Sequence, residues 1–216
     1  MTQNKRNYQK EMEKTIEGLQ GNRKSLLLHS CCAPCSSAVL EKLQEIFDVT
    51  VFFYNPNISE NEEYRKRVEE QKRLIETFNQ QMPAFPIKMI EGDYEPQEFY
   101  NIAKGWEKCP EGGERCFRCF ALRLEKTAWL AKEGNYDFFT TTLTISPLKN
   151  AAKLNEIGEE MARKYKTVFL PSDFKKKEGY KRSIELSKIY DLYRQNFCGC
   201  VFSKAESKKR EGNMEG

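Results

Sequence analysis

The sequence predicts an α/β fold in which a parallel sheet is covered by helices on both faces. Short apolar runs alternate along the chain with longer segments in which apolar residues recur at helical spacing. One apolar run, residues 26–28, leads directly into three cysteines and then into a helical pattern. Strands that alternate with helices indicate βαβ units, whose connecting helices cover the sheet. We expect residues 1–203 to form one such domain.

The individual elements follow from local patterns. Strands rich in β-branched, aromatic or leucine residues are expected at residues 26–29, 49–54, 87–90, 136–142 and 167–170. Helices are expected at residues 5–20, 37–47, 59–79, 95–104, 114–132, 148–165 and 181–192. Ser59 with Glu62 has the spacing of a capping box. Residues 204–216 are charged and contain glycine, which predicts a disordered tail.

Composition bounds the possible functions. The chain has 216 residues, with 36 Lys and Arg against 32 Asp and Glu, so its net charge of +4 is compatible with nucleic-acid binding without requiring it. Residues 1–20 have no apolar core of a secretory signal, and no stretch reaches the roughly 18 apolar residues of a membrane span. We therefore expect a cytoplasmic protein. Eight cysteines in a reducing compartment favour metal binding or redox chemistry over disulfides.

Seven of the eight cysteines fall in three groups, which are Cys31/Cys32/Cys35, Cys116/Cys119 and Cys198/Cys200. The first group follows a predicted strand, at the sheet edge where α/β folds bind ligands. The amide groups of the following helix favour thiolates there. Two cysteine pairs from separate elements can form a four-thiolate site for zinc or an iron–sulfur cluster. Adjacent Cys31 and Cys32 favour a cluster, because neighbouring residues do not readily supply two corners of one small tetrahedron. A structural zinc site is the alternative.

The other two cysteine features differ from that pattern. A disulfide between Cys198 and Cys200 would close a very small, strained ring, which is typical of a labile redox pair. The alternative is that both residues bind metal. Cys109 stands alone in the sequence and is predicted to be a buried free thiol.

The remaining polar residues give weaker signals. His29 is the only histidine and lies in an apolar strand, so it is predicted to be a core residue. A hydrolase mechanism that uses a histidine as its base is therefore not favoured. Asn55 and Asn57 follow one predicted strand, Thr142 is the last residue of another, and Ser146 lies in the loop after it. These side chains are candidates for substrate binding at the cysteine edge, although ordinary turn formation explains each of them equally well.

Taken together, these motifs resemble the QueH-type epoxyqueuosine reductase family. The resemblance lies in HSCCAPC at 29–35, YNPNI at 54–58, RCFRC at 115–119 with RLEKTA at 123–128, TTTLTISP at 140–147 and YRQNFCGCVFS at 193–203. It extends over residues 26–203. The N-terminal helix, Cys109 and the charged tail lie outside it.

The resemblance implies a function, a cofactor and a fold. It implies reduction of epoxyqueuosine to queuosine at the wobble position of tRNA, with a [4Fe–4S] cluster held by Cys31, Cys32, Cys116 and Cys119. It also implies that Cys198 and Cys200 are redox-active and that the electron donor is a separate partner. The implied fold is Rossmann-like, similar to the adenine-nucleotide α-hydrolase group.

The chemistry implied by this family requires further groups. Opening an epoxide to an alkene needs two electrons and protonation of the departing oxygen, which leaves as water. A cluster passes electrons singly, so the Cys198/Cys200 pair or an additional iron would supply the other electron. Asp93 and Asp173 are candidates for the general acid or for ligands of that iron.

The RNA substrate and two alternative functions complete the predictions. Anticodon loops are bound through phosphates and through bases stacked on aromatic or arginine planes, which makes Trp106, Arg115 and Arg118 candidates for RNA binding.

One alternative function is an ATP-dependent tRNA sulfur-transfer enzyme, but the chain lacks the Ser-Gly-Gly type of pyrophosphate loop. The other is a zinc-clipped RNA-binding module without catalysis.

Overall fold

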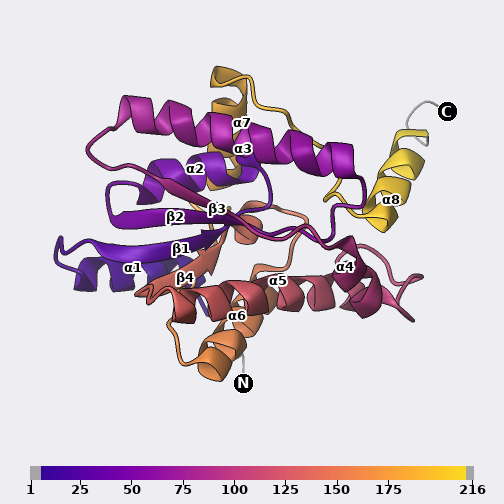
Figure 1. The fold of residues 1–216 in the computed structure, drawn as a ribbon, viewed down its shortest axis with the longest axis horizontal. Coiled ribbons are helices and arrows are strands. Elements are labelled where there is room, and N and C mark those ends of the chain that lie inside the picture. Colours follow the sequence, from indigo (N-terminus) through magenta and orange to yellow (C-terminus); the bar gives the residue numbers. More distant parts are fainter. Residues whose placement is uncertain (1–5, 213–216) are drawn as a thin grey trace.

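A computed structural model describes residues 6–212 (Figure 1). Its four-stranded parallel sheet has the order β3-β2-β1-β4. The strands are β1 (Lys24–His29), β2 (Phe47–Phe53), β3 (Lys88–Glu91) and β4 (Phe138–Thr141). The helices are α1 (Tyr8–Gly18), α2 (Ala33–Leu43), α3 (Asn61–Gln81), α4 (Pro96–Ala103), α5 (Glu114–Glu133), α6 (Ala151–Tyr165), α7 (Gly179–Ile189) and α8 (Val201–Gly212), with a 3-10 helix, η1, at Thr142–Ile145. The α/β prediction is confirmed. Residue 5, at the start of the predicted first helix, lies outside the described residues.

The sheet topology places a ligand-binding edge beside β1. From β1 the chain proceeds outward through β2 to β3, and it then returns to add β4 on the opposite side of β1. In register, Leu26 pairs with Phe138 and His29 with Thr141. Because the strand order reverses between β1 and β4, the connections leaving their carboxyl ends diverge and open a crevice there. The cysteine motif begins two residues after β1 ends.

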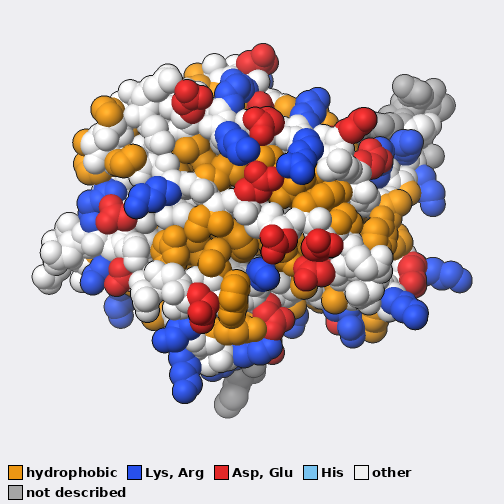
Figure 2. Space-filling view, in the orientation of Figure 1, with side chains coloured by type: hydrophobic (Ala, Val, Ile, Leu, Met, Phe, Trp, Pro, Cys, Tyr) orange, Lys and Arg blue, Asp and Glu red, His pale blue; other side chains and the backbone are white. Residues whose placement is uncertain are grey.

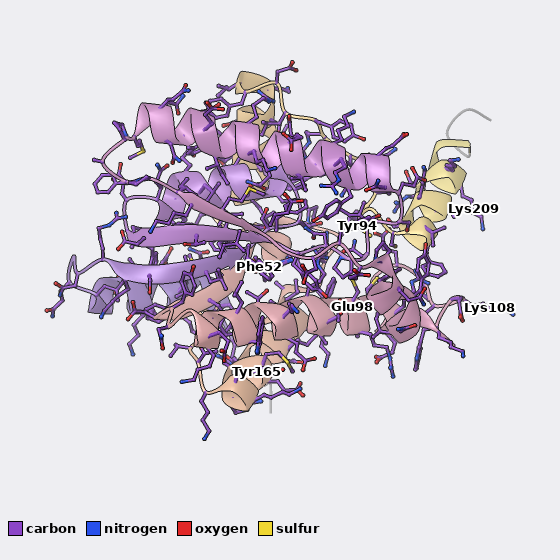
Figure 3. The ribbon with its side chains drawn as sticks, viewed as in Figure 1. Phe52, Tyr94, Glu98, Lys108, Tyr165 and Lys209 are labelled. Carbon is purple, nitrogen blue, oxygen red and sulfur yellow. The ribbon has the colours of Figure 1, made fainter. Side chains whose placement is uncertain are left out.

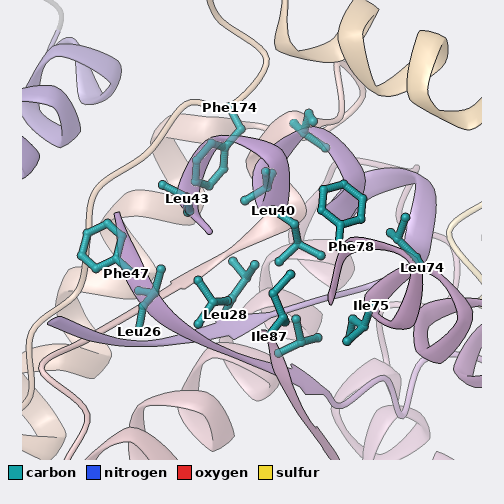
Figure 4. Close-up of a cluster of buried hydrophobic side chains, with 14 of the residues drawn as sticks. Leu26, Leu28, Leu40, Leu43, Phe47, Leu74, Ile75, Phe78, Ile87 and Phe174 are labelled. Atoms are coloured by element: carbon teal, nitrogen blue, oxygen red, sulfur yellow. The ribbon is translucent and has the colours of Figure 1, made fainter. Parts of the chain in front are cut away.

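The side chains of β1 point alternately into two hydrophobic cores, one on each face of the sheet. Leu26 and Leu28 pack with α2 and α3, in the cluster that Figure 4 shows. Leu27 points to the opposite face and packs with apolar residues of α5 and α6. This alternation is the period of a β-strand, and burial on both faces explains why the run is uniformly apolar. The central strand is therefore anchored from both sides, and so is the turn that follows it.

Two predicted elements near the sheet differ in the structure. Helix α2 begins at Ala33, with Cys32 as its N-cap, whereas we expected it to begin at residue 37. Pro34 fits because a proline in the first turn of a helix has no hydrogen bond to lose. The fifth strand predicted at 167–170 is wrong: Phe169 makes only an isolated bridge to Phe139. Two backbone hydrogen bonds join this segment to β4, too few for a ladder.

The C-terminal segment also differs from the prediction. Residues through Gly212 form helix α8, where we expected a disordered tail from residue 204. Ser203 and Ser207 are buried, and Lys204 forms an ion pair with Glu60. Docking on the body supplies the ordering that composition alone does not predict. Residues 213–216 lie outside the described part of the chain.

On the face that Figure 2 shows, Lys and Arg side chains are interspersed with Asp and Glu, so charges of neither sign dominate it. This agrees with the mild net charge. Among residues 6–212, no helix has both the length and the apolar character needed to cross a bilayer.

Candidate active site

The turn after β1 gathers three sulfur atoms. The Sγ atoms of Cys31, Cys32 and Cys35 all lie within 4.8 Å of one another, and those of Cys31 and Cys32 are 3.8 Å apart. A tetrahedron with metal–sulfur bonds of 2.3 Å has edges of about 3.8 Å. Contrary to the expectation that adjacent cysteines do not readily supply two corners of one tetrahedron, the spacing of Cys31 and Cys32 matches such an edge. Cys35 joins the group because α2 begins early and places it on the first helical turn.

The three thiols shift one another's pKa values in opposite directions. Contacts with the thiols of Cys32 and Cys35 hold the pKa of Cys31 well below its ordinary value. The thiolate at Cys31 in turn raises the pKa of Cys32 to about 12 and raises that of Cys35 as well. The Cys31 amide donates to Thr142 Oγ1 at 3.4 Å, and Thr142 Oγ1 lies 3.7 Å from the Cys31 sulfur. Thr142 thus touches the cysteine turn, as its position at the end of a predicted strand indicated.

A buried polar network supports the turn from below. Arg123 reaches from α5 and donates through Nε to His29 Nε2 at 3.2 Å. Nε2 also lies 3.1 Å from the Tyr54 carbonyl oxygen, and Nδ1 lies 2.8 Å from Thr141 Oγ1, so both ring nitrogens have buried polar partners. Burial and the Arg123 charge lower the pKa of His29 to about 3, so the imidazole stays neutral. The prediction that His29 is a core residue is confirmed.

Asn55 belongs to the same network. Its Nδ2 donates to the carbonyl of Ser30 at 2.9 Å, and its Oδ1 accepts a hydrogen bond from Arg123. Both functional ends of this amide are therefore used inside the protein, which makes it a positioning group for the cysteine turn. The amide has a second N–H and a second lone pair beyond these two hydrogen bonds, and the substrate-binding role of Asn55 stays a prediction.

The Cys198/Cys200 pair lies on a segment of residues 190–200, which we call the strap. The strap follows α7 and crosses α3, where its backbone is held by polar side chains. Arg67 and Asn57 both donate to the carbonyl of Cys198 at 3.2 Å. Ser59 is fixed to the far end of the strap: its amide donates to the Gly199 carbonyl at 3.0 Å and its hydroxyl accepts from Val201. Asn57 therefore positions Cys198, and Ser59 serves the strap instead of capping α3.

Gly199 is required where it stands. Its φ of +110° is unfavourable for other residues, and a Cβ there would lie 2.8 Å from Ile58 Cγ1. The turn it makes brings the sulfurs of Cys198 and Cys200 to 3.5 Å. Contact with the Cys200 thiol, followed by attraction to Lys149, lowers the pKa of Cys198 to about 5, whereas the pKa of Cys200 is raised.

Two adjoining cavities bring the cysteine groups together. The first, of about 130 Å³, is lined by the turn cysteines and by Cys198. The second, of about 30 Å³, is lined by Cys116, Cys119, Cys198 and Cys200. Glu111, Arg123, Leu148, Lys149 and Cys198 line both. Burial raises the pKa of Cys119 to about 11 and also raises that of Cys116.

Lys149 supplies positive charge between the cavities. Burial alone would lower the pKa of this amine, but attraction to the nearby sulfur groups, Cys31 first, raises it. Arg123 adds a second cation beside Cys119. A set of buried thiols opposed by fixed cations is an environment that favours thiolate and metal binding.

The structure places the other predicted residues in different surroundings. Ser146 lines the first cavity. Arg115 is buried and donates to the carbonyls of Trp106, Glu107 and Cys109, so it holds the loop before α5. The Arg118 guanidinium lies 4.8 Å from the centre of the exposed Trp106 ring, so the two side chains form an accessible stacking pair.

Lys108 and Lys209 extend from one end of the molecule, as Figure 3 shows.

Neither predicted acid reaches the cavities. Asp93 is exposed, and Asp173 is buried beside Lys175 at 3.4 Å. Neither residue lines the first or the second cavity. Sequence reasoning missed Arg67, Lys149 and Glu111, which do line them. Arg123 was part of a recognised motif, but nothing in its local sequence indicates that it lies beneath the cysteine turn.

Comparison with known proteins places the chain in a family. The profile of the epoxyqueuosine reductase QueH family matches residues 26–206. The chain belongs to this family. An epoxyqueuosine reductase QueH of Staphylococcus epidermidis is 45% identical over 207 residues, which cover 94% of this chain and 87% of the relative. One from Streptococcus pyogenes is 45% identical, covering 84% and 71%, and one from Thermotoga maritima is 35% identical, covering 88% and 95%. The name of this family describes a reduction. It therefore supports neither of the two alternatives, a sulfur-transfer enzyme or a zinc module without catalysis.

Proposed function

We propose that this protein reduces epoxyqueuosine to queuosine at the wobble position of tRNA. The observation that supports this best is the convergence of seven cysteines from three distant segments on two adjoining cavities at one edge of the sheet. Removing the epoxide oxygen by reduction needs a local source of electrons, and thiols and thiolate-bound metals are such sources. The relatives that cover most of the chain are named for this reduction.

The proposed cofactor is a [4Fe–4S] cluster held by Cys31, Cys32, Cys116 and Cys119. Soft thiolate donors suit iron–sulfur clusters, and the crowded turn sulfurs, with cations nearby, suit a negatively charged group. When bound, the cluster would supply electrons one at a time. Cys35 is a further donor on the same turn, available to an additional iron beside the cluster.

The proposed partner of that cofactor is the Cys198/Cys200 pair. The two sulfurs are already 3.5 Å apart, with Cys198 favouring the thiolate. The overall step balances when the dithiol is oxidised: epoxide and two thiols give alkene, one disulfide and water. The disulfide must then be reduced by an external electron donor. A cytoplasmic location suits this cycle, because thiols are kept reduced there.

An anaerobic turnover assay tests the proposal. Reconstituted protein is incubated with tRNA that carries epoxyqueuosine and with a chemical reductant, and the nucleosides are analysed by mass spectrometry. The product should have lost one oxygen atom. Without added reductant, the reduced protein should form product in a single turnover and then stop. No deoxygenated product under either condition would contradict the function.

A further inference from the structure

Glu111 is the one carboxylate among the described residues that line the two cavities. The first cavity is otherwise rich in cations, since Arg67, Arg123, Lys149 and Arg194 also line it. Neither aspartate expected from the sequence lies there. A single acid in an otherwise basic cavity lined by cysteines is suited to one positive charge on a ligand, while the cations suit phosphate or developing negative charge.

The carboxylate is held in a defined orientation. Its side chain is 19% exposed, its Oε1 accepts from Ser203 Oγ at 3.0 Å, and its Oε2 lies 3.4 Å from Arg210. Ser203 Oγ also accepts from the Cys198 amide at 3.1 Å. One hydroxyl therefore links Glu111 to the redox cysteine. Arg210 is half exposed, so its pairing with Glu111 is weak and leaves the carboxylate charge available.

The substrate of the proposed reaction carries a matching charge. In epoxyqueuosine a secondary amine joins the epoxide-bearing ring to the base, and such an amine is protonated near neutral pH. We infer that Glu111 binds this ammonium group and thereby sets both the specificity for the modified base and the position of the ring near Cys198. This inference rests on the proposed function, and it assigns a substrate contact to a residue outside the cysteine motifs.

The test uses product binding, so that it does not depend on turnover. Two anticodon stem-loops are compared, one with queuosine and one with guanosine at the wobble position. The wild-type protein should prefer the queuosine loop about tenfold, and Glu111→Gln should remove that preference while leaving the guanosine loop unaffected. Glu114→Gln is the matched control, because Glu114 is in the same segment, pairs with Arg118 and lines neither cavity. It should retain the preference.

A pH series provides a second readout. The wild-type preference should fall as pH rises through the pKa of the substrate amine, whereas Glu111→Gln should show no such fall. A variant that keeps the full preference, or that binds both loops equally less tightly, would overturn the inference and leave Glu111 as a structural link to α8. These results differ from failure of the proposed function, in which wild-type protein makes no deoxygenated product.

Discussion

The cysteine turn after β1 and the C-terminal strap hold their thiols by different means. The turn is fixed between a central strand packed on both faces and the first turn of α2. The strap lies outside the sheet, and α3 holds it largely through polar contacts, in which Glu70 accepts from the Tyr193 amide and Arg73 donates to the carbonyls of Tyr190 and Asp191. Packed cores change shape at high cost, whereas polar surface contacts open more readily.

This difference suggests a division of labour. A resident metal group needs donors that do not move, which the turn provides. A thiol pair that alternates between reduced and oxidised forms needs local freedom, which the strap provides. The comparison predicts that changes in the turn abolish metal binding, whereas changes in the strap leave the metal in place and alter redox chemistry.

The largest effect is expected from removing a turn cysteine. Cys32→Ala should lower iron per chain by at least about tenfold after anaerobic reconstitution, because a direct ligand matters at least as much as its supporting groups. Cys109→Ala, whose residue lines neither cavity, should retain full iron. Iron and acid-labile sulfide determinations provide the measurement. Full loading of Cys32→Ala would remove the turn from the metal site.

The strap is tested next through the reactivity of Cys198 in metal-free, reduced protein. An ordinary thiol alkylates roughly a hundredfold faster at pH 8 than at pH 6, because its pKa is about 8.5. With its pKa lowered to about 5, Cys198 should react at a nearly constant rate over this range. Peptide mapping by mass spectrometry follows the site. Cys200→Ala removes the hydrogen-bond donor and should raise the pKa of Cys198 and partly restore the pH dependence; a steep wild-type profile would refute the lowered pKa.

The support beneath the turn is tested by stability against pH. Folded His29 stays neutral with a pKa of about 3, but unfolding returns its pKa to about 6.5, so the unfolded state takes up a proton at lower pH. Stability should therefore fall by about 2 kcal/mol from this group between pH 7.5 and pH 5. Urea unfolding of wild type and His29→Asn isolates the contribution, since thiols affect both proteins alike. Equal pH dependence in the two would show that the pKa of His29 in the folded protein is close to its value in the unfolded chain.

The smallest effect is expected at the exposed Trp106–Arg118 pair, outside both regions. Arg118→Gln should weaken binding of queuosine and guanosine stem-loops equally and lower the salt slope of binding by about one. Lys132→Gln, at the opposite end of α5, is the control. A change confined to the queuosine loop would instead place Arg118 in base recognition.

Local sequence predicted those parts of the fold that local physics determines. The apolar runs of β1 and β2 and the helical periods of α3, α5 and α6 were predicted because burial on a sheet or along a helix face leaves a direct pattern. The missed features depend on distant partners. Residues 167–170 have strand composition but meet β4 only briefly, and α8 has a charged composition but is ordered by docking.

The same distinction applies to the site. Cysteines are rare and clustered, so the sequence indicated all seven that line the cavities. Arginines and glutamates are common on any surface, and nothing local marks Arg67, Arg123 or Glu111 as residues that line the cavities of the cysteines. Asn55 and Asn57 were expected to bind substrate because polar residues after strands face the binding edge. Their amides also hold Ser30, Arg123 and Cys198, a positioning role that the sequence did not indicate, and their contact with substrate stays a prediction.

The most direct test of the account measures iron and product on one anaerobic sample of wild type, Cys198→Ser and Cys200→Ser. We predict that both serine variants retain wild-type iron and visible absorbance, while conversion of epoxyqueuosine to queuosine in tRNA falls to background. Loss of iron in proportion to activity would make the strap cysteines metal ligands, and intact activity in both variants would remove them from the reaction; either result would contradict the division between turn and strap.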